Sequence, residues 1–565
     1  MSMKMWLRET HGPVFELFRH FLGSFFDSDR ITATEHTPAA LVGGLSVVMQ
    51  WMFLFIQPLK VKYEQLSTLP APGLYREALR ADELWLITLT MAAIGLLTAI
   101  KWNALFPSLR DYRSLASLPL RPRQIFAAKL LALLTVASAA VMAINFLPAF
   151  GFPAVSGGRW APALSLGRRG LANFAACSAG GFFLFFALIA FEGLLLNLLT
   201  PRRFGRVAGV LQGFLVAAML MLLVFSFSIQ TATAAVLLAP VAARWLPPIW
   251  FLGLHQWLTG DPDPSMQILA HRGLAALGIA AAMTLALYAL SYRRHRTLLI
   301  EATSNGARPH RSGRILEWLL PNPRQQAVAF FLGKTFARSD SHRTILAAYF
   351  GFGFAVLLTS VMGIGTLFPA ERLNAAYLVY SHVIFLVFLL LGLRHTFSLP
   401  AEQGANWTFR IVEKQGRQDW MLALDRLVLL GGAVVLLAVP LPFELKLLGW
   451  RTIPEVVLFA ALAVPCYEFA FGSWEKLPFT CSYLPGKTPA WIVAVELFAL
   501  LIALPSISGA MVVCLYHPLA FVPALAVFAA AGFHLRRQRM RTWGRSPLQY
   551  EELPEPVIHG LSLLR

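Results

Sequence analysis

Long apolar stretches alternate with short polar segments along the sequence, a pattern typical of a chain that crosses a membrane many times. A helix rises about 1.5 Å per residue, so about 18 or more apolar residues are long enough to cross a hydrocarbon core of about 30 Å. Twelve stretches meet this length, and we predict a membrane-spanning helix in each. They are 39–57, 82–100, 124–150, 171–199, 206–229 and 273–292 in the first half, and 345–368, 374–398, 421–442, 453–473, 490–513 and 519–536 in the second.

An amphipathic helix is predicted ahead of the first span, in the N-terminal segment 1–38. Apolar side chains recur there at helical spacing, while Glu16, Arg19 and His20 fall on the opposite side. Such a helix lies in the plane of the membrane interface, and its interrupting charges argue against a signal-peptide core. The apolar positions are Val14, Phe15, Leu17, Phe18, Phe21, Leu22, Phe25 and Phe26.

Composition supports an all-α polytopic membrane protein and excludes a soluble one. Of the 565 residues 57% are hydrophobic and 14% charged, and the mean hydropathy is +0.61, so a soluble fold of this size would lack the polar residues to cover its surface. The net charge of +19 does not indicate nucleic-acid binding, because the bases fall between apolar runs.

The distribution of bases predicts the orientation. With a cytoplasmic N-terminus, the loops on the cytoplasmic side hold 36 of the 48 Lys and Arg residues. This skew follows the positive-inside rule and places both ends of the chain in the cytoplasm. The excess of Arg over Lys, with abundant Ala and Leu, suggests a GC-rich bacterial genome and hence the cytoplasmic (inner) membrane.

The spans fall into two sets of six. We predict a first six-span unit at 39–292, a basic cytoplasmic linker at 293–344, a second six-span unit at 345–536 and a cytoplasmic tail at 537–565. Both units run from inside to inside, so a true repeat would be parallel, related by an axis along the membrane normal. The alternative is twelve spans whose even number gives the appearance of halves.

The segment 231–265 is predicted to lie outside, between the fifth and sixth spans. It is too interrupted by Pro and Arg to cross the bilayer and too apolar for a free loop, so we expect short helices that dip into the outer leaflet. Trp245, Trp250 and Trp257 suit that depth. Irregular backbone there must pack on protein or line a wet cavity.

A basic, Pro-punctuated cytoplasmic loop runs directly into the third span within 105–134. At this point the sequence resembles the permease subunits of ATP-binding-cassette exporters of the second type, in which a Leu-Pro-led basic element follows the second span and leads into the third. The matching residues are Leu118, Pro119, Arg121, Arg123 and Lys129, and Arg110, Asp111 and Pro122 belong to the same loop. The resemblance extends to the N-terminal helix, the six-span unit and the external helices.

The resemblance implies that this loop couples the membrane helices to a separate P-loop ATPase, of which two copies would bind ATP and Mg²⁺. The alternative is a solvated basic loop that obeys the positive-inside rule. The second half has an equivalent loop, in which Asn406, Trp407, Arg410 and Arg417 are candidate contacts, but it lacks the Leu-Pro-led form and carries interleaved acids.

Three carboxylates at membrane depth are further candidates: Glu192, Glu468 and Glu496. A central acid costs about 2.5–3.5 kcal/mol on insertion scales, so each is a candidate functional residue. We favour structural pairing for Glu192 and Glu468, with bases such as Arg202 or Lys476, and expect Glu496 to reach the interface. His382 is a single histidine in an apolar span, expected to be packed and hydrogen-bonded.

No enzyme motif is found in the sequence. PGKT (485–488) ends like a phosphate loop, but Cys481 stands where the first glycine is required. Zinc-protease, nucleophile-elbow and Asp-rich lipid-phosphate motifs are absent. The four cysteines, Cys177, Cys466, Cys481 and Cys514, form no CxxC or Cys/His cluster, so neither a disulfide framework nor a structural zinc site is supported.

The leading hypothesis is the membrane-spanning subunit of an ATP-driven exporter for a hydrophobic or lipidic substrate, without an ATPase of its own. One alternative is a proton-coupled secondary transporter with parallel six-span repeats, in which the intramembrane glutamates carry protons. Another is a membrane-embedded lipid enzyme or an assembly protein, which would need its polar residues to converge on one cavity. The residues concerned are Gln50, Asn145, Asn173, Asn197 and Gln212.

Overall fold

The computed structural model forms two compact units, Met1–Gly306 (unit 1) and Ala307–Arg565 (unit 2), and the division falls inside the predicted linker. The regular elements of both units are helices wherever the chain is described. The residues described are 13–23, 57–107, 122–161, 163–229, 244–261, 263–301, 320, 322–399, 401, 417–472, 474, 476, 478–480 and 490–543.

Ten helices among these residues are long and apolar enough to cross a membrane, and each coincides with a predicted span. The predicted span 39–57 lies almost wholly outside the described residues. The predicted span 490–513 falls on a helix whose described apolar part is Ala503–Tyr516. The ten helices are Pro72–Ile100, Arg123–Val155, Leu166–Leu198, Val207–Phe227, Pro264–Ser291, Ser341–Val361, Ala370–Ser398, Met421–Ala438, Leu441–Phe471 and Leu519–Arg541.

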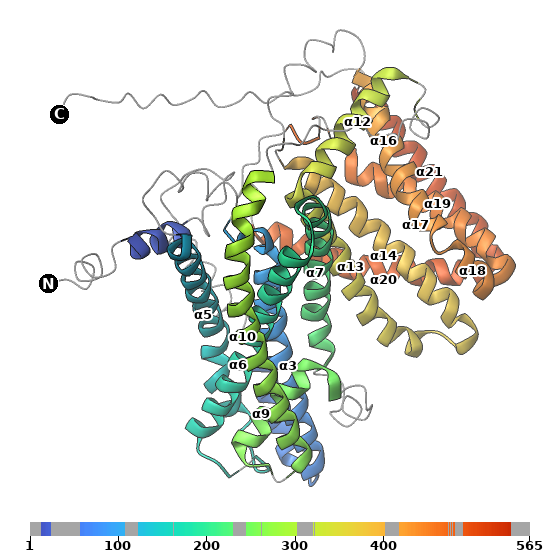
Figure 1. Ribbon diagram of the computed structural model, residues 1–565. Coiled ribbons are helices and arrows are strands. Elements are labelled where there is room, and N and C mark those ends of the chain that lie inside the picture. Colours follow the sequence, from blue (N-terminus) through green and yellow to red (C-terminus); the bar gives the residue numbers. More distant parts are fainter. Residues whose placement is uncertain are drawn as a thin grey trace, which may run out of the picture. The chain divides into compact units, whose positions relative to one another are not determined.

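Unit 1 is arranged around helix α6 (Leu166–Leu198), which packs against α3, α5, α9 and α10 (Figure 1). The other helices are α3 (Pro72–Ile100), η1 (Trp102–Ala104), α5 (Pro122–Val155), α7 (Pro201–Ile229), α9 (Pro247–Thr259) and α10 (Pro264–Glu301). Prolines stand at the first helical positions of α3 and α9, where the missing N–H costs no hydrogen bond. The Ser165 side chain caps α6 by accepting from the Arg168 N–H.

Residues 13–23 form a helix that packs on the beginning of α5. Leu17 and Phe21 are buried there against Ile125, Ala128 and Ala132, while Glu16 and Arg19 remain solvent-exposed. The predicted two-sided helix therefore has its apolar side covered, at least in part, by protein.

The short helix α9 occupies the segment predicted to hold external helices. It ends at Gly260, whose φ of 83° forms the left-handed cap. At Gly253, an added Cβ would lie 2.7 Å from the Met266 carbonyl oxygen, so α9 and α10 approach each other backbone to backbone. Trp245, two residues before α9, and Trp257, within α9, are both exposed.

Unit 2 is arranged around α14 (Ala370–Ser398) and α19 (Thr452–Phe471), whose buried side chains share one core. Helix α14 packs against α13, α19 and α20, and α19 packs against α21. The remaining elements are α12 (Pro323–Arg338), α13 (Asp340–Leu367), α16 (Arg417–Val428), the π-helix η6 (Leu429–Ala433), α17 (Val434–Ala438), α18 (Leu441–Leu448), η7 (Gly449–Arg451), α20 (Ala490–Tyr516) and α21 (Pro518–Trp543).

The two units share a pattern of helix contacts. If the spans of each unit are numbered one to six, the second packs against the fourth and fifth, and the fourth packs against the third and sixth. In unit 1 these pairs are α3 with α6 and α7, and α6 with α5 and α10. In unit 2 they are α14 with α19 and α20, and α19 with η6 and α21.

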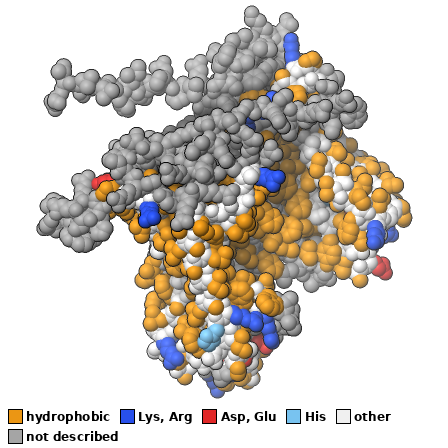
Figure 2. All heavy atoms as spheres, in the orientation of Figure 1, with side chains coloured by type: hydrophobic (Ala, Val, Ile, Leu, Met, Phe, Trp, Pro, Cys, Tyr) orange, Lys and Arg blue, Asp and Glu red, His pale blue; other side chains and the backbone are white. Residues whose placement is uncertain are grey.

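Apolar side chains cover most of the helix surface that is visible in Figure 2, and charged side chains are few between the helix ends. Large hydrophobic residues face outward in both units, among them Phe214 (68% exposed), Phe469 (84%) and Leu519 (93%). Such a surface is stable in a lipid environment and would aggregate in water.

Candidate functional site

Most residues of the two predicted coupling loops lie outside the described residues. Arg110, Asp111, Leu118, Pro119 and Arg121 fall in the first gap, and Asn406, Trp407 and Arg410 in the second. Pro122 is the first residue of α5 and Arg417 the first of α16. Each candidate loop therefore leads directly into the helix predicted as a third span.

The coupling-motif lysine, Lys129, is buried near the start of α5 and is 5% exposed. Its ammonium lies over the Phe21 ring of helix 13–23, 4.8 Å from the centroid, a favourable cation–π contact. Arg123, one and a half turns earlier, is exposed. Lys129 thus anchors helix 13–23, whereas Arg123 faces outward.

Glu192 on α6 is buried, 3% exposed. Its Oε2 atom has no hydrogen-bond partner among the described residues. Lys129 of α5 and Tyr288 of α10 are buried as well. The Tyr288 hydroxyl donates to the Leu105 carbonyl at 2.5 Å, just beyond η1.

Glu468 on α19 is part of a buried ionic cluster, and its base is Arg539 of α21. The Arg539 guanidinium donates to both oxygens of Asp425 on α16, at 2.9 and 2.7 Å. It also lies 2.8 Å and 2.6 Å from the two oxygens of Glu468. Tyr467 donates its hydroxyl to Asp425 at 2.5 Å. We call Asp425, Glu468 and Arg539 the arginine cluster.

Glu192 and Glu468 occupy corresponding places in the two units. Each lies in the last third of the helix predicted as a fourth span, α6 or α19. Both side chains are buried, and in unit 2 Arg539 of the predicted sixth span joins Glu468 to Asp425 of the predicted third span. Glu496 lies in α20, and its side chain is outside the described part.

His382 contacts two glutamates that the sequence analysis did not indicate. Its Nε2 lies 2.9 Å from Oε1 of Glu444 on α18, and its Nδ1 lies 2.7 Å from Oε1 of Glu455 on α19. All three residues are buried, and they offer one donor atom each within 4.8 Å of one another. The histidine that we predict to be packed and hydrogen-bonded therefore lies between two carboxylates. We call these three residues the His–Glu–Glu cluster.

A further polar network in unit 1 joins the start of α3 to helix 57–68 and to α9. Lys62 and Tyr63 of helix 57–68 both donate to Asp82 of α3. The next residue, Glu83, accepts a hydrogen bond from the Gln256 side chain of α9, and His255 Nδ1 lies 3.3 Å from the Glu83 carboxylate. Burial raises the pKa of Tyr63 well above its usual value, and the adjacent Asp82 carboxylate adds to this rise.

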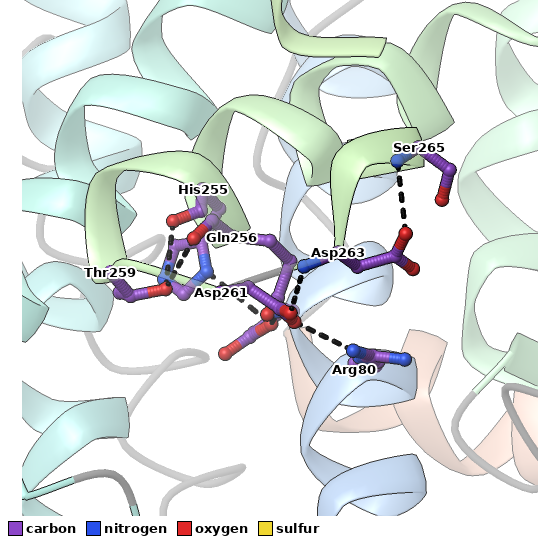
Figure 3. Close-up of polar contacts among 8 residues, drawn as sticks. Arg80, His255, Gln256, Thr259, Asp261, Asp263 and Ser265 are labelled. Carbon is purple, nitrogen blue, oxygen red and sulfur yellow. Dashed lines mark hydrogen bonds and ion pairs between the residues drawn. The ribbon is translucent and has the colours of Figure 1, made fainter. Parts of the chain in front are cut away.

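The segment that connects α9 to α10 is part of the same network (Figure 3). Arg80 donates to Asp261 at 2.6 Å, and Asp261 Oδ1 accepts from the Asp263 N–H. The Ser265 side chain and N–H both interact with the Asp263 carboxylate, which lowers the pKa of Asp263. Asp263 thereby caps the first turn of α10.

The residues missed by sequence reasoning are acids and bases near the ends of predicted spans, some just inside and some just outside. Asp82 and Glu83 stand together at the start of an apolar run, and Arg539 stands three residues beyond the end of another. That adjacency is a usable signal, because an uncompensated charge is unfavourable at this depth. The polar residues Asn145, Asn173, Asn197 and Gln212 instead make separate contacts between or within helices.

Comparisons with models of protein families, with curated proteins and with solved structures give no match to this chain.

Proposed function

We propose that this chain is the transmembrane subunit of an ATP-driven exporter in the cytoplasmic membrane, made of two parallel six-span permease units. ATP and Mg²⁺ are bound by a separate P-loop ATPase, two copies of which dock on the cytoplasmic loops. The substrate is hydrophobic or lipidic. Both ends of the chain are cytoplasmic, and twelve helices cross the bilayer, the ten found here together with 39–57 and 490–513.

The observation that supports this proposal best is the shared pattern of helix contacts in the two units. The second span packs on the fourth and fifth, and the fourth on the third and sixth, in both. In each unit a buried glutamate lies in the last third of the fourth span, Glu192 in α6 and Glu468 in α19. A duplicated permease accounts for both regularities, whereas twelve unrelated spans account for neither.

The arrangement suggests how a loop movement reaches the membrane helices. The loop 105–121 leads into α5 at Pro122, and Lys129 on α5 holds helix 13–23 through Phe21. Helix α5 also packs along α6. A push on the loop therefore moves α5 together with an interfacial N-terminal helix and is transmitted to α6, which contacts most of unit 1.

The arginine cluster has the corresponding position in unit 2. There the salt bridges tie α16, α19 and α21 into one body, so a push on the loop before Arg417 moves three helices at once. Glu468 is held in this body by its salt bridge to Arg539.

The deciding experiment is affinity purification of the detergent-solubilised chain from its native cells, with identification of copurified P-loop ATPases. We expect an ATPase to copurify, and the double substitution Arg121→Glu and Arg123→Glu to remove it. The matched control is Arg76→Glu with Arg159→Glu. Both bases are exposed and far along the chain from the coupling loop: Arg76 is near the start of α3, and Arg159 lies four residues after the end of α5.

If no ATPase is recovered under mild crosslinking, the exporter proposal fails. If the ATPase is recovered but both double variants retain it, the exporter proposal stands and the assignment of the coupling loop fails. Transport that persists without ATP and is abolished by Glu192→Gln would favour the proton-coupled carrier.

A further inference from the structure

The His–Glu–Glu cluster contains more acceptors than the donors around it can satisfy. His382 is the residue that bridges the two glutamates, and the exposed fractions of the three side chains are 4% or less. The close approach of His382 Nε2 to Glu444 Oε1 lacks the geometry of a hydrogen bond, and Glu444 Oε2 and Glu455 Oε2 have no hydrogen-bond partner among the described residues. Buried carboxylates normally have all their oxygens paired.

A neutral imidazole cannot resolve this arrangement. It carries one N–H, so it donates to one glutamate and presents a lone pair to the other. Yet both ring nitrogens lie within 3 Å of a carboxylate oxygen. One of these contacts therefore places two acceptors against each other, which is repulsive unless a proton or a metal cation lies between them.

An additional proton resolves only part of the imbalance. An imidazolium has two N–H donors and satisfies one oxygen of each glutamate. The second oxygens then still lack partners, and the cluster keeps a net charge of −1 in a buried site. A divalent cation brings two carboxylates and a neutral imidazole to zero net charge and ligates the remaining oxygens.

We propose that His382, Glu444 and Glu455 form a binding site for a divalent transition-metal cation in unit 2. The donor set of one imidazole nitrogen and carboxylate oxygens suits Zn²⁺, Mn²⁺ or Fe²⁺ better than Ca²⁺ or Mg²⁺, which prefer oxygen alone. One ring nitrogen binds the cation while the other donates to a carboxylate, as in most metal-bound histidines.

The position of the cluster defines what the cation does. Its ligands come from three helices, α14, α18 and α19, and Phe459 packs against the imidazole with ring centroids 5.2 Å apart. The cation therefore fastens the short helix α18 to the core of unit 2. This inference is independent of the exporter proposal, because metal binding is a property of the chain itself.

The test uses the full-length chain in detergent, with any affinity tag removed, stripped with a chelator and titrated with Zn²⁺ or Co²⁺. We expect about one equivalent to bind, with Co²⁺ giving the visible absorption of a site with nitrogen and oxygen ligands. We expect His382→Gln, Glu444→Gln and Glu455→Gln each to weaken binding by at least about tenfold. His395→Gln is the matched control, because His395 lies on the same helix and contacts Tyr349.

Binding of less than 0.1 equivalent by the wild-type chain, at about micromolar metal, would overturn the proposal and leave a protonated histidine as the explanation. Equal affinity of the His382→Gln and His395→Gln variants would also overturn it. If the three variants do not fold, the wild-type chain decides: added Zn²⁺ must raise its Tm and a chelator must lower it. A Tm unchanged by either treatment rejects the site.

Discussion

The ammonium nitrogen of Lys62 lies 2.9 Å from each of the two carboxylate oxygens of Asp82. The Tyr63 hydroxyl donates to the same carboxylate at 2.7 Å. The buried Asp82 carboxylate of α3 thus accepts hydrogen bonds from two consecutive residues of helix 57–68. Three hydrogen bonds at a single carboxylate fix the position of a helix that precedes the first described span of unit 1.

Asp82→Ala is expected to lower the free energy of unfolding by roughly 1–3 kcal/mol, because it leaves the buried Tyr63 hydroxyl without an acceptor. Chemical denaturation in detergent measures the change. The control is Glu64→Ala, since Glu64 pairs with Lys60 on the surface and exposed pairs contribute little. A loss as small as that of the control would show that Asp82 does not anchor helix 57–68.

Tyr63 is expected to make the protein less stable in alkali. Burial and Asp82 raise the pKa of Tyr63 above its usual value of 10.0, so the folded state holds this proton more tightly than the unfolded state. The contribution is complete below about pH 10 and is lost above it, by up to about 1.4 kcal/mol per pH unit. Tyr63→Phe should reduce the slope of stability against pH above 10, and an unchanged slope would contradict the assignment.

Arg539→Met is expected to destabilise unit 2 by about 3–5 kcal/mol, because it leaves Asp425 and Glu468 buried without their cation. Thermal unfolding in detergent is the measurement, with the exposed Arg541→Met as control. Replacing the arginine together with both acids by apolar residues should recover much of the loss. Failure of that triple substitution to recover stability would indicate a role beyond charge pairing.

Gly253→Ala is expected to lower stability by about 1–3 kcal/mol, because the new Cβ meets backbone atoms of α10 that cannot turn away. Gly278→Ala is the matched control within unit 1, since an added Cβ there meets nothing within 4 Å. Comparison of the two melting temperatures tests the close approach of α9 and α10. Equal effects of the two substitutions would show that this approach is not required.

The spans were predictable because hydrophobic length is a local property of the sequence. Ten of the twelve predicted stretches coincide with helices that meet the length and hydropathy of a membrane span. The short helix α9 was predictable in kind from the interrupted apolar segment 231–265, and it begins at Pro247 and ends before Gly260.

The partners of the buried charges were not predictable, because they are set by packing between distant helices. Glu468 was expected to pair with a base such as Lys476, eight residues away, and it pairs with Arg539, 71 residues away. In the sequence His382 stands alone in an apolar span, because the two glutamates that it contacts are 62 and 73 residues away. Apolar periodicity shows which side of a helix is buried but not which neighbour covers it.

The π-helix η6 interrupts the span Met421–Ala438 between α16 and α17. A π-turn holds one residue more than an α-turn, so side chains on its far side are rotated by about 100° relative to an uninterrupted helix. The inserted residue thus permits Asp425 to face Arg539 while the later turns present a different set of side chains. The helix predicted as the third span of unit 2 therefore consists of two α-helical segments joined through a π-turn, with an angular offset between the sides that they present to their neighbours.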